Sequence, residues 1–343
     1  MQLRQALFNL DAYARYKQGK AQAVLSEQIF SIRTQDLLLR LIGAYFDVLF
    51  ADEQVALVQS QRDAFAEQRT VNERLLKHGE GTRTDVLEVQ ARFELAEAQL
   101  IEAKDNQDTA RLTLAGIIGG EPGKLSSMND GFRMQSLQPS NVEAWRSLAL
   151  RSNPELLAQT TAIEVAKQEI NKARAGHAPR LDFVASYSKT ASETINTLNQ
   201  DATIRGVGVQ LNIPLYAGGA VNAATRQSVA NLEKVKADLQ AKTDKALIEV
   251  NKQFSAVQSG ILRVNALNRA VEAGNLLVKA TEQSIKGGVR INLDLLNAQQ
   301  QVYSSKRDLA QARYGYLLAS LRLRAAAGTL SAEDVAQTST YFR

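Results

Sequence analysis

Cysteine is absent from the 343 residues of this chain. Its absence excludes disulfide scaffolds, thiol catalysis and zinc sites that depend on cysteine. It agrees with the oxidising bacterial periplasm, but cytosolic proteins also manage without cysteine, so the compartment stays open. Histidine is scarce too, with two residues, and the chain has no acid–base pair, nucleophilic triad or metal-ligand cluster in its sequence pattern. The sequence therefore predicts neither an enzyme nor a cofactor.

Long apolar runs and basic blocks are also missing. No run reaches the length of about 18 apolar residues that a membrane-spanning helix needs. Barrel strands are short and only alternately apolar, so hydropathy leaves a membrane β-barrel open. The 41 basic and 36 acidic side chains give a net charge of +5 and are interspersed along the chain. This pattern predicts no nucleic-acid partner.

Proline is rare, and the five prolines all lie between Pro122 and Pro214. Because a proline inside a helix costs about 3 kcal/mol, the two proline-free flanks are free to be helical throughout. Beyond Pro214 the chain is rich in alanine, glutamine and lysine. Its apolar residues there step by four and three, as in a coiled coil: Val250, Phe254, Val257, Ile261 and Val264. These features predict a very long helix.

One part of the sequence repeats another. A shift of 209 superposes residues 75–120 on 284–329 without a gap, with Asp85 on Asp294 and Gly79 on Gly288. The same register aligns Gly119 with Gly328, so glycines that end helices coincide in both copies. Agreement of this kind predicts an internal duplication.

The predicted organisation is two repeats joined by a connector. The first repeat covers 1–120, with the end of a strand at 1–8, a long helix at about 9–77 and a helix at about 83–118. The connector covers 121–152. The second repeat covers 153–330, with a helix at 154–176, strands at 181–189 and 204–215, a long helix at 220–286 and a helix at 292–326. A tail follows at 331–343.

The repeat places Met1 inside a strand, because "LRQALFNL" aligns with "LNIPLYAG" at a shift of 208. The first copy therefore lacks counterparts of the helix and strand that open the second copy. We expect a first helix, a first strand and a signal peptide ahead of this chain, whose own start has no apolar h-region.

The predicted strands alternate between apolar residues and mostly small polar residues. In "GVGVQLNIPLYAGG", which begins at residue 206, every second residue is apolar. One apolar face fits packing on a soluble core or contact with lipid. The small polar residues of the other face suit a water-filled lumen, and a lone hairpin is only marginally stable. The candidate lipid-facing residues are Phe183, Tyr187, Val207, Val209, Leu211 and Ile213.

The order of elements and two motifs resemble the TolC family of outer-membrane efflux and secretion ducts. The motifs are the strand exit "PLYAGG" and a turn-helix pattern, G-x-x-x-x-x-D-[VL]-L-x-x-Q, that begins at both Gly79 and Gly288. The resemblance implies a mainly α fold with a β-barrel part: long antiparallel coiled-coil helices form a trimeric tunnel, and β-hairpins contribute to a transmembrane barrel. It implies a homotrimer in the cell outer membrane, in contact with outer-membrane lipid and extending into the periplasm.

The resemblance also assigns roles to the turns. It implies a periplasmic gate at the helical tip, onto which Arg290, Asp294, Asn297 and Asp85 fall. For Asp294 a second explanation stays open, because a carboxylate in a first helical turn is stabilised by the helix dipole. The turns would bind a periplasmic adaptor (membrane fusion) protein through Gly79, Glu80, Gly81, Gly287, Gly288 and Val289. The bend from barrel to tunnel would lie at Pro214, Gly218 and Gly219.

The implied function is passive export. The duct would carry protein from a type I secretion ABC transporter across the periplasm and the outer membrane. One alternative is a duct for multidrug or metal efflux, joined to a proton-driven pump. Another, from a different class, is a soluble coiled-coil scaffold, which leaves the alternating strands unexplained.

Overall fold

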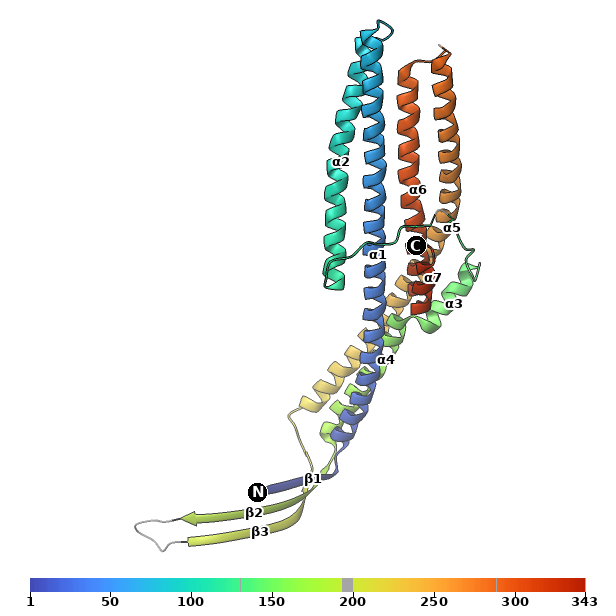
Figure 1. The fold of residues 1–343 in the computed structure, drawn as a ribbon. Coiled ribbons are helices and arrows are strands. Elements are labelled where there is room, and N and C mark those ends of the chain that lie inside the picture. Colours follow the sequence, from blue (N-terminus) through green and yellow to red (C-terminus); the bar gives the residue numbers. More distant parts are fainter. Residues whose placement is uncertain (130, 193–199, 288, 343) are drawn as a thin grey trace. The chain divides into compact units, whose positions relative to one another are not determined.

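The computed structural model describes residues 1–129, 131–192, 200–287 and 289–342. Its elements are, in chain order, β1 (Gln2–Phe8), α1 (Leu10–Lys77), α2 (Arg83–Ile118), α3 (Val142–Ser152), α4 (Pro154–Arg174), the 3₁₀ turn η1 (Ala175–His177), β2 (Arg180–Ser192), β3 (Gln200–Asn212), α5 (Ala220–Lys286), α6 (Asn292–Ala326) and α7 (Ala332–Ser339) (Figure 1). The chain is mainly helical with one small sheet, as the sequence predicted.

The chain forms two compact units, which we describe separately. The first unit contains residues 1–32 and 154–245, and the second contains residues 33–153 and 246–343. The long helices α1 and α5 each contribute residues to both units.

The first unit contains the sheet, whose antiparallel strands lie in the order β1-β2-β3. Phe183 pairs with Val209 and Ala185 pairs with Val207, so apolar residues of neighbouring strands share one face. That face is exposed in this single chain, with Val207 at 78% and Val209 at 62% of full exposure. β3 ends at Asn212, earlier than the predicted 215, because Pro214 has no N–H to donate to a neighbouring strand.

Helices of the first unit are joined by polar contacts. The Nε2 atom of Gln18 in α1 donates to Glu169 of α4 at 2.5 Å. Gln159 of α4 donates to the carbonyl oxygen of Val235 in α5 at 3.0 Å, and its own oxygen accepts from Lys242 at 2.8 Å. These side chains connect α4 with one long helix on each side.

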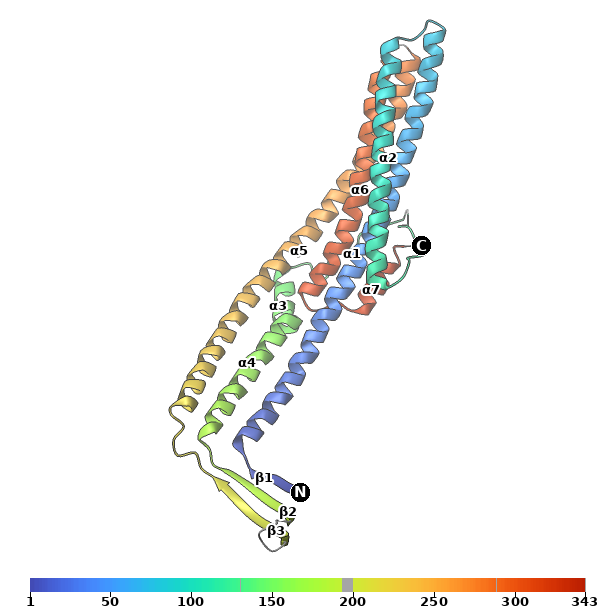
Figure 2. The ribbon, with the colours of Figure 1, turned by 90° about the vertical axis from the view of Figure 1, so that its left-hand side faces the viewer.

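The second unit contains two helical hairpins, α1 with α2 and α5 with α6, which run alongside each other (Figure 2). In the second hairpin, Gly274 faces Val302 and Gly260 faces Tyr316, which matches a single antiparallel register. A Cβ at 274 would lie 2.8 Å from a methyl of Val302, so glycine permits this close approach. The shared core of the unit contains Phe46, Trp145, Val257 and Leu323, together with Phe342 near the C-terminus.

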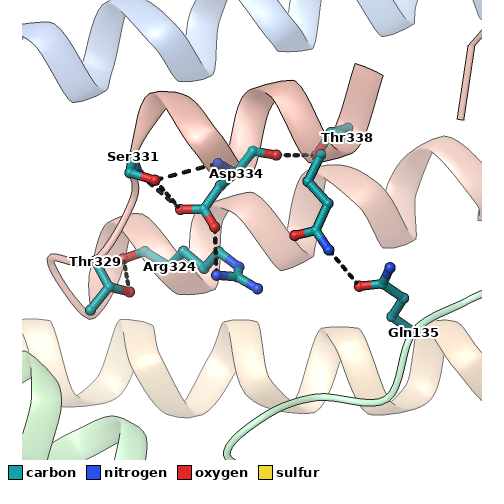
Figure 3. Close-up of polar contacts among 7 residues, drawn as sticks. Gln135, Arg324, Thr329, Ser331, Asp334 and Thr338 are labelled. Carbon is teal, nitrogen blue, oxygen red and sulfur yellow. Dashed lines mark hydrogen bonds and ion pairs between the residues drawn. The ribbon is translucent and has the colours of Figure 1, made fainter. Parts of the chain in front are cut away.

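The C-terminal residues form helix α7, which the sequence pattern described only as a tail. Ser331 and Asp334 make a capping box at its start, and Arg324 of α6 donates to Asp334 at 2.6 Å (Figure 3). Gln337 donates to Gln135 of the connector at 3.2 Å. Helix α7 is therefore hydrogen-bonded to both α6 and the connector.

Within the described residues, no helix is both long enough and apolar enough to cross a membrane.

Candidate functional site

The turn between α1 and α2 is closed by a glycine and a capping box. Gly79 has a φ of 77°, a left-handed conformation that favours glycine. The hydroxyl oxygen of Thr82 accepts from the N–H of Asp85 at 3.1 Å, and the Asp85 carboxylate accepts from the N–H of Thr82 at 3.1 Å. Glu80 is exposed and Gly81 is half-buried. The carboxylate of Asp85 thus stabilises the start of α2.

The turn between α5 and α6 is built differently. Ile291 is the N-cap of α6 and has no side-chain oxygen, so Asp294 lacks the capping partner that Asp85 has. Arg290 and Val289 are exposed, and Gly287 is exposed beside them. Gly288, which the family resemblance assigns to the adaptor-binding turn, lies outside the described residues. Asp294 is therefore in the first turn of α6 without a capping box.

The two hairpins are connected near these turns by a network of side-chain amides. Asn72 of α1 is buried, and its Nδ2 donates to the carbonyl oxygen of Asp85 at 3.2 Å. Its Oδ1 accepts from Asn292 of α6 at 3.1 Å, and Gln68 donates to Asn292 at 2.8 Å. This network was not predicted from the sequence. The signal that could have revealed it is a polar residue at a helix position that the 3.6-residue period turns toward a neighbouring helix.

A second connection involves a predicted gate residue. Arg92 of α2 donates from Nη2 to the Oδ1 of Asn297 in α6 at 2.8 Å. Around this contact, Phe65, Val89, Ala96 and Leu296 form a small apolar cluster from α1, α2 and α6. The structure thus brings Asn297 to the other hairpin.

Further along the same helices lies a cleft of about 630 Å³ between α1, α2 and α6. Its lining is mixed, with Gln54, Gln61, Glu102, Tyr303 and Arg307 beside apolar residues of α1. The Nε2 atom of Gln54 is buried and has no hydrogen-bond partner among the described residues. The described residues hold no group of three or more His, Cys, Asp or Glu side chains suited to a metal.

A half-buried carboxylate links α1 with α6. Tyr314 donates its hydroxyl to Glu53 Oε1 at 2.5 Å. Burial raises the pKa of the Glu53 carboxyl, and the opposing effects of the Tyr314 hydrogen bond and of Arg313 do not cancel it. Burial together with the Glu53 carboxylate raises the pKa of Tyr314 as well. The pair therefore favours a protonated Tyr314 and disfavours an ionised Glu53.

The sheet is the other candidate functional region. Phe183, Val207, Val209 and Leu211 lie on the same face, because residues paired across antiparallel strands share a side. Tyr187 lies on that face too, paired with Arg205, whose guanidinium is 5.8 Å from the centroid of the tyrosine ring. Ile213 follows the end of β3 and is 53% exposed.

The segment from β3 to α5 has two consecutive glycines in left-handed conformation. Gly218 has a φ of 59° and Gly219 a φ of 80°. Other residues rarely adopt these angles, so the glycines permit the change of direction between strand and helix. Pro214 precedes them and ends strand pairing.

The family model described as "Outer membrane efflux protein" matches residues 1–120 and 145–329, which include both hairpins and the sheet. The chain belongs to this family. The long helical hairpins and the small sheet both lie within the residues that the family model matches. Membership confirms the resemblance drawn from the turn motifs and agrees with the prediction that the chain is not an enzyme.

Individual members of the family are similar over nearly the whole chain. The alkaline protease secretion protein AprF of Pseudomonas aeruginosa is 42% identical over 337 residues, which are 98% of this chain and 70% of that protein. The outer membrane protein TolC of Escherichia coli is 28% identical over 346 residues, 98% of this chain and 70% of that protein. The chain therefore spans about 70% of the length of these relatives.

Solved structures show the same fold. The structure of the outer-membrane channel OprN superposes with a TM-score of 0.80 and covers 96% of this chain and 74% of that one. The sequence identity is 21%, so this likeness concerns the fold alone.

Proposed function

We propose that this chain is a subunit of an outer-membrane channel that passively conducts protein delivered by a type I secretion ABC transporter. The observation that carries the proposal is the likeness to AprF, a protein named for alkaline protease secretion, at 42% identity. The sheet supports it, since Val207, Val209 and Leu211 are exposed on one face of β3, and the alternate residues Gly206, Gly208 and Gln210 lie on the other face. Such strands suit a wall between lipid and water.

The proposed assembly is a homotrimer in the cell outer membrane. Its hairpins contribute to a barrel, and its helices extend into the periplasm as a tunnel. A sheet of three strands has two free edges, and strands from neighbouring copies would pair with them. The lipid-facing residues are Phe183, Tyr187, Val207, Val209, Leu211 and Ile213, and Pro214, Gly218 and Gly219 form the bend.

We also propose that the two hairpins arose by duplication. α1 and α2 have 68 and 36 residues, and α5 and α6 have 67 and 35. Matching lengths in matching order support one ancestral hairpin for both.

The proposed gate lies at the turns of these hairpins and contains Arg290, Asp294, Asn297 and Asp85. Support comes from the different caps, because the carboxylate of Asp85 is engaged by Thr82 and Asp294 has no such partner at Ile291. Asp294 is therefore the better candidate of the two carboxylates for a role in the pore. The exposed turns at 79–81 and 287–289 are the proposed binding surface for a periplasmic adaptor protein.

Efflux of drugs or metals is the second candidate, favoured by the description of the family as efflux proteins. It would pair the same duct with a proton-driven pump. Family membership argues against the third possibility, a soluble coiled-coil scaffold.

A deletion strain of the host bacterium separates the two candidates. The strain is complemented with the wild-type gene or an empty vector, and both extracellular protein and retention of a fluorescent efflux dye are measured. Type I secretion predicts that deletion abolishes a secreted protein and leaves dye retention unchanged. Retained dye with normal secretion would favour efflux, and no change in either would overturn the proposal.

A further inference from the structure

Three charged side chains meet on the polar face of the sheet, where β2 begins. Arg4 of β1 donates from Nε and Nη2 to Oδ2 of Asp182, at 3.0 and 2.5 Å. Arg180 donates from Nε to Oδ1 of Asp182 at 3.1 Å. Two guanidinium groups thus share one carboxylate, and the cluster has one net positive charge.

The burial of the three groups is unequal. The side chain of Asp182 is 0% exposed, whereas those of Arg4 and Arg180 are 45% and 43% exposed. Water beside this face therefore meets the guanidinium groups and not the carboxylate that they enclose. The accessible surface of the cluster is positive.

The rest of this face is uncharged. Alternation and the strand register place Gln2, Ser186, Gly206, Gly208 and Gln210 on it. Within the described parts of β1, β2 and β3, the cluster supplies all the charged side chains of this face. Lys189 and Arg205 belong to the opposite face. A positive group on an otherwise uncharged surface dominates its local potential.

We propose that Arg4, Arg180 and Asp182 form an anion-attracting ring in the lumen of the channel, at the end of the barrel next to the helices. This inference rests on the proposed function, because it requires the polar face to line water in a trimer. Three copies bring three net positive charges to one level of the pore. Rings of charged side chains select ions of opposite sign, here chloride and the carboxylates of a passing chain.

The cluster also connects β1 to β2, so the test preserves an ion pair in every variant. Arg4→Gln leaves Arg180 on Asp182, and Arg180→Gln leaves Arg4 on it. Each variant makes the cluster neutral by a different route. If one variant fails to assemble, the other still tests the proposal.

The experiment measures the reversal potential of the full chain in planar bilayers under a potassium chloride gradient, at low and at high ionic strength. Both variants should lower the anion-to-cation permeability ratio by about twofold or more at low salt, and screening should reduce the difference at high salt. Arg205→Gln is the matched control, since it removes the same charge from the opposite face and should leave the ratio unchanged.

Wild-type permeability ratios in both variants, with normal currents, would overturn the ring and leave the channel function intact. An equal change in Arg205→Gln would also overturn it, because the effect would then not depend on the face. No current from the wild-type protein, and none from the Arg290→Ala variant that should open the proposed gate, would instead overturn the proposed function.

Discussion

Gly328 has a φ of 72° just after α6, where the chain passes close to the end of α3. A Cβ at this position would lie 2.1 Å from the carbonyl oxygen of Ser152. Both the angle and the contact require glycine, and the second reason exists only because the fold brings residues 152 and 328 together. At the scale of single residues, such contacts identify positions where any side chain larger than that of glycine is unfavourable.

Gly328→Ala should destabilise the second unit by at least about 2 kcal/mol, from the left-handed angle together with the backbone clash. The matched control is Gly315→Ala within α6, where a Cβ meets nothing within 4 Å. It should stabilise the helix by about 0.5–1 kcal/mol. Thermal unfolding followed by circular dichroism measures both. Equal melting temperatures for the two variants would contradict the prediction.

Glu53 makes stability depend on pH. Burial raises its pKa above the ordinary value, so the folded state binds its proton more tightly than the unfolded state. The stabilisation by that proton is complete below the unfolded pKa and disappears as pH rises through the folded pKa. Glu53→Gln does not titrate and keeps an oxygen for the Tyr314 hydroxyl.

The melting temperature of Glu53→Gln relative to wild type should therefore increase from acid to neutral pH. Thermal scans at several pH values check it. Tyr314→Phe is the companion variant: it removes the hydrogen-bond donor from the half-buried carboxylate, so it should destabilise the protein most at neutral pH, where that carboxylate is ionised. A pH-independent difference for Glu53→Gln would mean that Glu53 titrates normally.

At the scale of elements, helix ends were readable from the sequence, whereas the pairing of β1 with β2 was not. The second long helix was expected over 220–286 and spans Ala220–Lys286. Glycines and prolines mark such ends through local backbone chemistry. The pairing of β1 with β2 connects residues about 180 positions apart, and alternation alone contains no information on partners. Alternation does determine which residues of a strand share a face.

Val209→Arg places a charge on the proposed lipid face of β3. It should cost about 2–4 kcal/mol if the residue lies near the bilayer midplane, and less toward the interfaces. Gln210→Arg is the control, because the neighbouring residue lies on the polar face of the same strand. The amount of trimer in the outer-membrane fraction measures both. If Val209→Arg formed normal amounts of trimer and Gln210→Arg formed none, the lipid-facing and lumen-facing sides of the strand would be the opposite of those proposed.

At the scale of the whole molecule, the proposed gate depends on how the hairpins hold each other. The amides of Asn72 and Asn292 connect α1 with α6, and Arg92 and Asn297 connect α2 with α6. A neutral hydrogen bond contributes about 0.5–1.5 kcal/mol and one from a charged group about 1.5–3 kcal/mol, so these contacts would hold the proposed gate closed by only a few kcal/mol.

Replacing Arg290 with Ala or Asp294 with Asn should raise the resting conductance of the channel by weakening the closed tip. Single-channel recording in planar bilayers measures it. Glu333→Gln in α7 is the control, since it changes one charge in a helix far along the chain from the turns. Unchanged resting current in both turn variants would place the gate elsewhere.

The sequence by itself determined the helices of the two hairpins, the two faces of the strands and the family. These follow from local periodicity and from glycine and proline chemistry, which act over a few residues. Only the tertiary structure decided the burial of Phe342, the amide network around Asn72 and the meeting of Arg4, Arg180 and Asp182. Each of these joins segments that are distant in the sequence. The physical reason is that a side chain's partners depend on which segments pack together, and no local pattern specifies that.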